Sequence, residues 1–96
     1  MLHLVNKSPF DGGGLNTATS IMKGDDTLLL IEDGVYGAMK NTRASALVEG
    51  RKVSVLGPDL AARGIPEDKL VDGVTVVDYA GFVDLVEAND KVQSWL

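Results

Sequence analysis

The stretch Thr27-Leu28-Leu29-Leu30-Ile31 decides the fold class of this 96-residue chain. Its apolar side chains are consecutive and do not alternate with polar ones. In an antiparallel sheet with one wet face the two kinds of residue alternate, whereas a parallel strand covered by helices is apolar on both faces. The stretch therefore predicts a central parallel strand with helices on both sides of the sheet.

Strand and helix candidates alternate on either side of this segment. The other strand candidates are 1–5, 52–56 and 74–77, and the helix candidates are 15–22, 44–49, 59–63 and the segment after Asp78. Pro58 is expected in a first helical turn, Gly64 at a helix end and Asp78 as an N-cap. Alternation of this kind predicts an α/β fold, here one small domain over residues 1–96 with a mostly parallel four-stranded sheet.

Composition excludes several function classes. Nine basic against fourteen acidic residues give a net charge of −5, which argues against direct binding to nucleic acid. The sequence holds no cysteine, so this chain can provide neither a disulfide nor a thiol nucleophile. It shows no leader-like segment and no apolar run of eighteen residues, and we expect a cytoplasmic protein without a membrane span or a cofactor.

Three places in the sequence resemble reactive or binding motifs. Glu32 and Asp33 could form an acid–base pair, but a solvated turn with Asp33 as N-cap explains them more simply. The run Gly12-Gly13-Gly14 is similar to a phosphate loop, although its spacing matches no such motif and Asp11 would repel an anion. His3 has no second metal ligand nearby in the sequence, which favours a structural histidine. No catalytic or metal site is predicted.

The C-terminal pair Trp95-Leu96 is a candidate contact surface. A tryptophan near a chain end either covers the protein's own core or inserts into a partner, and the sequence leaves both open. We expect Trp95→Ala to weaken assembly more than it destabilises the isolated chain. The candidate interface residues are Trp95, Leu96, Tyr36 and Phe10. Other apolar residues outside the strand pattern also suggest a contact surface, namely Leu60, Ile65, Val71 and Val92.

Five local strings, in order from first residue to last, resemble the TusB/DsrH family. They are Met1-Leu2-His3-Leu4-Val5-Asn6-Lys7-Ser8-Pro9-Phe10, Leu28-Leu29-Leu30-Ile31-Glu32-Asp33-Gly34-Val35, Val55-Leu56-Gly57-Pro58-Asp59-Leu60-Ala61-Ala62-Arg63-Gly64, Val77-Asp78-Tyr79-Ala80-Gly81-Phe82-Val83-Asp84-Leu85 and Val92-Gln93-Ser94-Trp95-Leu96. The detail of the third and fourth strings is closer to the DsrH side.

The resemblance implies a small α/β subunit of the DsrE/DsrF/DsrH type. Such a subunit would join two related companions, of TusC and TusD or DsrF and DsrE type, in a heterohexamer that relays persulfide sulfur. The sulfur would pass to a TusE-like or DsrC-like carrier, either for 2-thiolation of the tRNA wobble uridine or for sulfur oxidation. The sequence does not distinguish these two branches.

One departure from the family limits what the resemblance implies. Some DsrH proteins carry a cysteine in the first helix, and this place aligns with Ala18. We therefore expect a non-catalytic subunit that completes the complex and shapes the surface where the carrier docks. Two alternatives stay open: an independent small-ligand or anion-binding module that uses residues 12–14, and a hydrolase that uses Glu32 and Asp33.

Overall fold

Five parallel strands form one sheet in the computed structural model, which describes residues 1–95. The order across the sheet is β4-β3-β2-β1-β5, so β3, β2 and β1 lie in its interior. The strands are β1 (Leu2–Val5), β2 (Thr27–Leu30), β3 (Val53–Leu56), β4 (Thr75–Val77) and β5 (Val92–Trp95).

The prediction of four strands is wrong, because β5 was missed. This strand pairs in parallel with β1, with Val92 beside Leu2 and Trp95 beside Val5. Its residues Val92, Gln93 and Ser94 are exposed, as befits a short strand at the edge of a sheet. An edge strand needs no continuous apolar run, so hydrophobic patterning does not reveal it.

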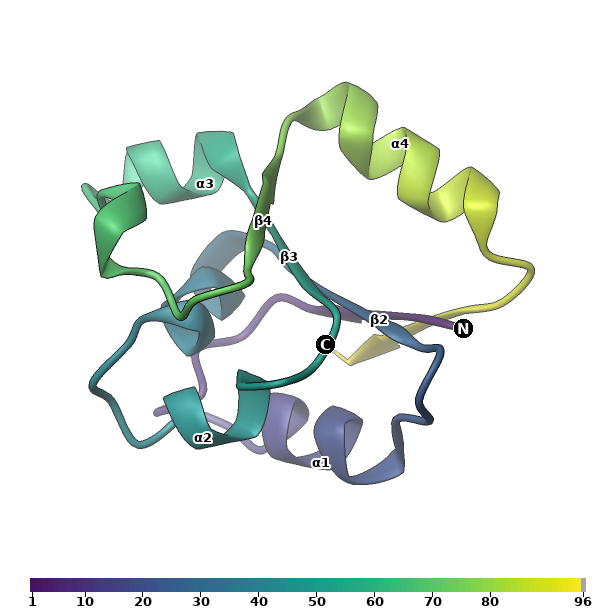
Figure 1. Cartoon of the computed structure of the whole chain (residues 1–96), viewed down its shortest axis with the longest axis horizontal. Coiled ribbons are helices and arrows are strands. Elements are labelled where there is room, and N and C mark those ends of the chain that lie inside the picture. The colour runs from purple at the N-terminus through teal and green to yellow at the C-terminus, as the bar shows by residue number, and fades with distance from the viewer. Residues whose placement is uncertain (96) are drawn as a thin grey trace.

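Helices cover both faces of the sheet, as predicted. They are α1 (Gly14–Ile21), η1 (Glu32–Ala38, a 3-10 helix), α2 (Ser45–Val48), α3 (Gly57–Ala62), η2 (Glu67–Lys69, also 3-10) and α4 (Tyr79–Ala88). The chain steps in one direction from β1 to β4 and then returns past β1 to β5. Because parallel crossovers are right-handed, the returning helix α4 lies on the opposite face from α1 and α2, as Figure 1 shows.

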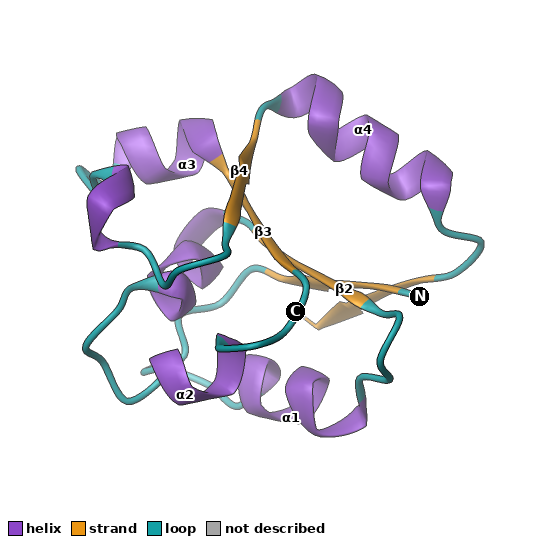
Figure 2. Ribbon diagram, in the orientation of Figure 1, coloured by secondary structure: helices purple, strands orange, loops and turns teal. Residues whose placement is uncertain are grey.

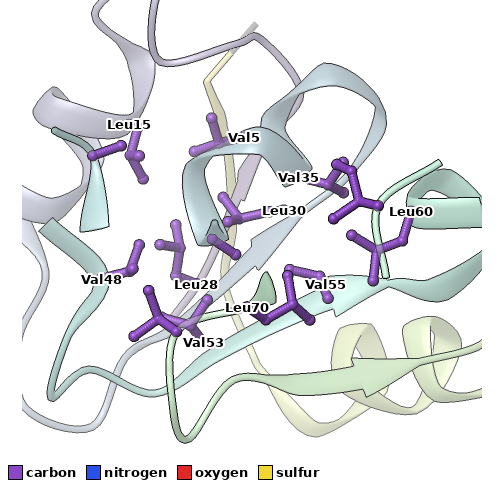
Figure 3. Close-up of a cluster of buried hydrophobic side chains, with 14 of the residues drawn as sticks. Val5, Leu15, Leu28, Leu30, Val35, Val48, Val53, Val55, Leu60 and Leu70 are labelled. Carbon is purple, nitrogen blue, oxygen red and sulfur yellow. The ribbon is translucent and has the colours of Figure 1, made fainter. Parts of the chain in front are cut away.

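The main core lies between one face of the sheet and the helices that cover this face, α1, η1 and α2. Leu28 and Leu30 of β2 point into this core together with Val5 and Val55 (Figure 3). Leu29, which points to the other face, is also fully buried. The prediction that β2 is a central strand covered on both faces is therefore confirmed.

Three local signals at helix ends are confirmed. The Asp78 side chain accepts a hydrogen bond from the Gly81 backbone N–H at 2.8 Å and so caps α4. Pro58 stands in the first turn of α3, and Gly64, just after that helix, has φ +65°. A left-handed residue at this place is the usual stop of a helix and favours glycine.

Candidate functional site

In open parallel sheets, ligands bind beyond the carboxyl ends of the strands. Figure 2 shows α3 and α4 starting directly beyond β3 and β4. A cavity of about 260 Å³ lies here, between the strand ends and α4. Its lining consists of Ile31, Glu32, Leu56, Asp59, Tyr79 and Phe82. The cavity therefore joins two carboxylates to apolar and aromatic walls, and this lining contains no nucleophile or cationic group.

Glu32 has a strained backbone that is held by Asp59. Its φ is +49°, in the left-handed region that a residue with a side chain adopts at a cost. The Glu32 N–H donates to Oδ2 of Asp59 at 2.6 Å, and Asn6 Nδ2 donates to Oε2 of Glu32 at 3.5 Å. Asp59 is thus used to fix the turn between β2 and η1.

Asp33 has a different partner from Glu32. The Arg63 Nε donates to its Oδ1 at 2.9 Å, and the Asp33 side chain is 60% exposed. The expectation that Asp33 caps a helix is wrong, since Ile31 is the N-cap of η1 and no side chain bonds there. The two carboxylates point to separate partners, and this arrangement does not provide the acid–base pair of a hydrolase.

The glycine run before α1 has a packing role at one of its positions. A Cβ on Gly14 would come within 3.4 Å of the Trp95 carbonyl oxygen, so glycine lets the start of α1 approach the end of β5. A Cβ on Gly12 would meet nothing within 4 Å. The run therefore forms a loop that makes one close packing contact, and its geometry does not form a binding site for an anion.

His3 is buried and both of its ring nitrogens have partners. The Trp95 indole Nε1 donates to Nδ1 at 3.2 Å, and Nε2 lies 3.0 Å from Oδ2 of Asp26. The hydrogen bond from His3, together with the Lys23 backbone N–H and the Met1 ammonium, holds the pKa of the Asp26 carboxyl well below its usual range. This cluster ties β1 to β5 and has the character of a structural histidine site.

The candidate interface residues do not form one patch in the described structure. Phe10 is 53% exposed in the turn after β1, whereas Tyr36 in η1 is partly buried and packs on the core. Trp95 is also partly buried and packs on the core while it binds His3. Leu96 lies outside the described residues. Trp95 therefore covers the protein's own core at least in part.

Three other residues suggested as a contact surface belong to the core. Leu60, Ile65 and Val71 are all buried in the main cluster, so that suggestion is wrong for them. Leu60 lies within α3, whereas Ile65 and Val71 lie in the irregular segments after α3 and η2, so strand patterning alone does not reveal their burial. Ala18, where some relatives carry a cysteine, is also fully buried in this cluster.

An exposed apolar stripe on α4 was not predicted as a surface. The sequence places Tyr79, Phe82, Val83 and Val86 on one helical face, which ordinarily packs inward. Phe82 and Val86 are half-buried, but Tyr79 is 62% and Val83 51% exposed, and no residue of α4 is buried. We call Tyr79 and Val83 the α4 stripe. These four residues have the spacing of an ordinary core-facing helix, so the sequence gives no signal that Tyr79 and Val83 are exposed.

Two further properties concern residues 1–95 as a whole. No helix within them combines the length and the apolar character that a membrane crossing needs. The same residues hold no group of three or more histidine or acidic side chains arranged as metal ligands.

Comparisons with known proteins match this chain over nearly its full length. The family model described as "DsrH like protein" matches residues 7–92. Protein TusB of Photorhabdus laumondii is 33% identical over 97 residues, which cover 99% of this chain and all of that protein. Protein TusB of Yersinia pestis is 31% identical with the same coverage.

Solved structures share the fold. The ychN protein from E. coli superposes with a TM-score of 0.80 at 18% identity, covering 97% of each chain. Protein Tm0979 from Thermotoga maritima superposes with a TM-score of 0.68 at 27% identity, covering 95% of this chain and 97% of that one. The five-stranded parallel sheet is thus an arrangement known from experiment.

Proposed function

This chain belongs to the TusB/DsrH family, and on that premise we propose that it is a non-catalytic small subunit of a cytoplasmic sulfur-relay complex. The observation that carries the proposal is the lack of any cysteine in a sequence related over its full length to TusB proteins. Sulfur moves between proteins through cysteine thiolates, which this chain does not have. Its contribution is therefore assembly with subunits that carry the thiol.

The α4 stripe supports an assembly role. Exposed apolar side chains that adjoin one another mark contact surfaces, and burial of large aromatic residues dominates binding energy. Val92, 42% exposed, lies on the same face of the sheet as α4, because Trp95 three residues later points to the core face. We infer that a companion subunit covers this side of the molecule, where the stripe and Val92 are exposed.

Of the two sulfur-relay branches, we favour tRNA thiolation. The relatives with full-length identity above 30% carry the name TusB, which supports the branch that modifies the wobble uridine. The companions are then of TusC and TusD type and the carrier is TusE-like. The net charge of −5 is consistent with a subunit that does not bind tRNA directly.

Co-expression with the two companion subunits tests the proposal. We expect a stoichiometric complex in size-exclusion chromatography with light scattering, and we expect sulfur transfer to the carrier to fall when this chain is omitted. The double variant Tyr79→Ser/Val83→Ser should reduce the amount of complex, whereas Asp84→Ser/Glu87→Ser, also exposed on α4, should not. A chain that elutes alone while its companions assemble and transfer sulfur normally would refute the proposal.

A further inference from the structure

A second cavity lies at the opposite end of the sheet, where the strands begin. Its volume is about 150 Å³, and it is formed by the loop between α1 and β2 and the loop between α2 and β3. Figure 1 shows these two loops entering the neighbouring strands β2 and β3. Three of the residues that line the cavity are cationic: Lys23, Arg51 and Lys52.

These three cations have no acidic partner within residues 1–95. The ion pairs of this part of the chain are Met1 with Asp26 and Arg63 with Asp33, and His3 also contacts Asp26. Arg51 is nevertheless oriented, because its Nε donates to the Leu47 carbonyl oxygen at 2.8 Å. The structure records no hydrogen bond of its terminal Nη atoms to residues 1–95, so the end of the guanidinium is available to a ligand.

The acid that lines the cavity, Asp26, is bound to groups other than the three cationic side chains. Its Oδ1 lies 3.1 Å from the Met1 ammonium, and its Oδ2 lies 3.0 Å from His3 Nε2 and 3.1 Å from the Lys23 backbone nitrogen. Both oxygens are therefore engaged away from the lysine and arginine side-chain nitrogens. The neighbouring acids Asp25 and Glu49 do not line the cavity.

Each of the two loops has a glycine with free space around its Cβ position. A Cβ on Gly24 or on Gly50 would meet nothing within 4 Å, so both positions face empty space. Gly50 has φ +74°, which turns the chain after α2 and brings Arg51 and Lys52 to the cavity.

We propose that this cavity binds a tetrahedral oxyanion of the phosphate class. An oriented guanidinium offers paired N–H donors to such an anion, and two ammonium groups add charge. The site lies apart from the α4 stripe and does not depend on the proposed function. It is also distinct from the glycine run before α1, where the sequence suggested an anion.

A titration with inorganic phosphate, followed by ¹H–¹⁵N NMR of the full chain, tests the proposal. We expect saturable shifts of the Gly24, Gly50 and Arg51 amides, with a dissociation constant in the low millimolar range, beyond what sodium chloride of equal ionic strength produces. Arg51→Gln and Lys52→Gln should each weaken binding about tenfold, the size of one charge-assisted hydrogen bond. The control Lys69→Gln removes an exposed charge in η2, and it should leave the affinity unchanged.

A second titration distinguishes a free anion from a phosphate carried by RNA. A short single-stranded RNA that competes with phosphate for the same amides would support the site and identify nucleic acid as a source. RNA that shifts these amides when inorganic phosphate does not would overturn the proposal. So would phosphate shifts that match those of chloride, or binding that Arg51→Gln leaves intact.

Discussion

The indole Nε1 of Trp95 lies 3.2 Å from Nδ1 of His3, so residues 92 positions apart in sequence are joined by a hydrogen bond. An indole N–H can only donate, which makes Nδ1 the acceptor and places the ring proton on Nε2. That proton points to Oδ2 of Asp26 at 3.0 Å. The geometry thus selects a neutral histidine tautomer that links the end of β5 to β1 and to the loop before β2.

Replacing His3 should destabilise the isolated chain. His3→Ala removes a side chain that is 1% exposed and leaves the Trp95 N–H without its acceptor, so we expect a loss of about 2–4 kcal/mol. Urea unfolding followed by circular dichroism measures it. Gln93→Ala is the matched control, since Gln93 lies beside His3 in the sheet but its side chain is exposed and, within residues 1–95, bonds only to the Ser94 carbonyl oxygen. Equal losses in the two variants would contradict this role of His3.

Trp95→Ala should lower stability as well as assembly, which modifies the expectation from sequence. Trp95 packs on the core and binds His3, so we expect the isolated chain to lose about 1–3 kcal/mol. Tyr79→Ser/Val83→Ser should weaken assembly with a much smaller loss, because both side chains are exposed. Urea unfolding of the isolated chains and co-purification with companions separate the two effects. An unchanged midpoint for Trp95→Ala would show that Trp95 acts only at an interface.

The Asp26 cluster predicts a loss of stability in acid. Hydrogen bonds from His3 and the Lys23 backbone N–H, with the Met1 ammonium, lower the pKa of Asp26 in the folded protein. A lowered folded-state pKa stabilises the protein above the unfolded-state pKa of about 4, and this contribution is lost as the pH falls toward the folded-state value. Asp26→Asn should therefore be less stable than the parent chain at pH 6.

The test is a series of urea midpoints between pH 6 and pH 2. The difference between the parent chain and Asp26→Asn should be full above pH 5 and should shrink as the pH falls below about 4. Asp25→Asn serves as control, because Asp25 is exposed and has no ion pair within residues 1–95. A constant difference at all pH values would rule out linkage through Asp26.

Gly34 determines how closely η1 approaches β1. A Cβ at this position would overlap the Val5 carbonyl oxygen, and the Gly34 N–H donates to the Asn6 carbonyl oxygen at 3.1 Å. Gly34→Ala should therefore cost about 2 kcal/mol or more, because backbone has to move. Gly24→Ala, where a Cβ meets nothing within 4 Å, should change the thermal midpoint little. Equal thermal midpoints for the two variants would show that the backbone at the start of η1 can shift at little cost in stability.

The features that the sequence predicted well are those encoded in a few adjacent residues. Consecutive leucines mark β2, and Asp78 marks the start of α4. Features made by residues far apart were not predicted: β5 exists because it pairs with β1, and Asp33 bonds to Arg63 thirty positions away. For the same reason, no local motif indicates that the loops before β2 and β3 meet at the second cavity.

Ala18 offers a direct test of whether the first helix could ever present a reactive thiol in this chain. The side chain is fully buried, and it belongs to the same core cluster as Leu15 and Leu28. Because the sequence has no cysteine, Ala18→Cys would carry a single thiol. We expect it to react with Ellman's reagent about a hundredfold more slowly than a thiol introduced by Ala46→Cys, since Ala46 is exposed on α2 and thiolate reactivity requires access. Both variants should react equally in urea. Rapid native reaction of Ala18→Cys would mean that α1 opens readily, and the position could then present a thiol to companion subunits.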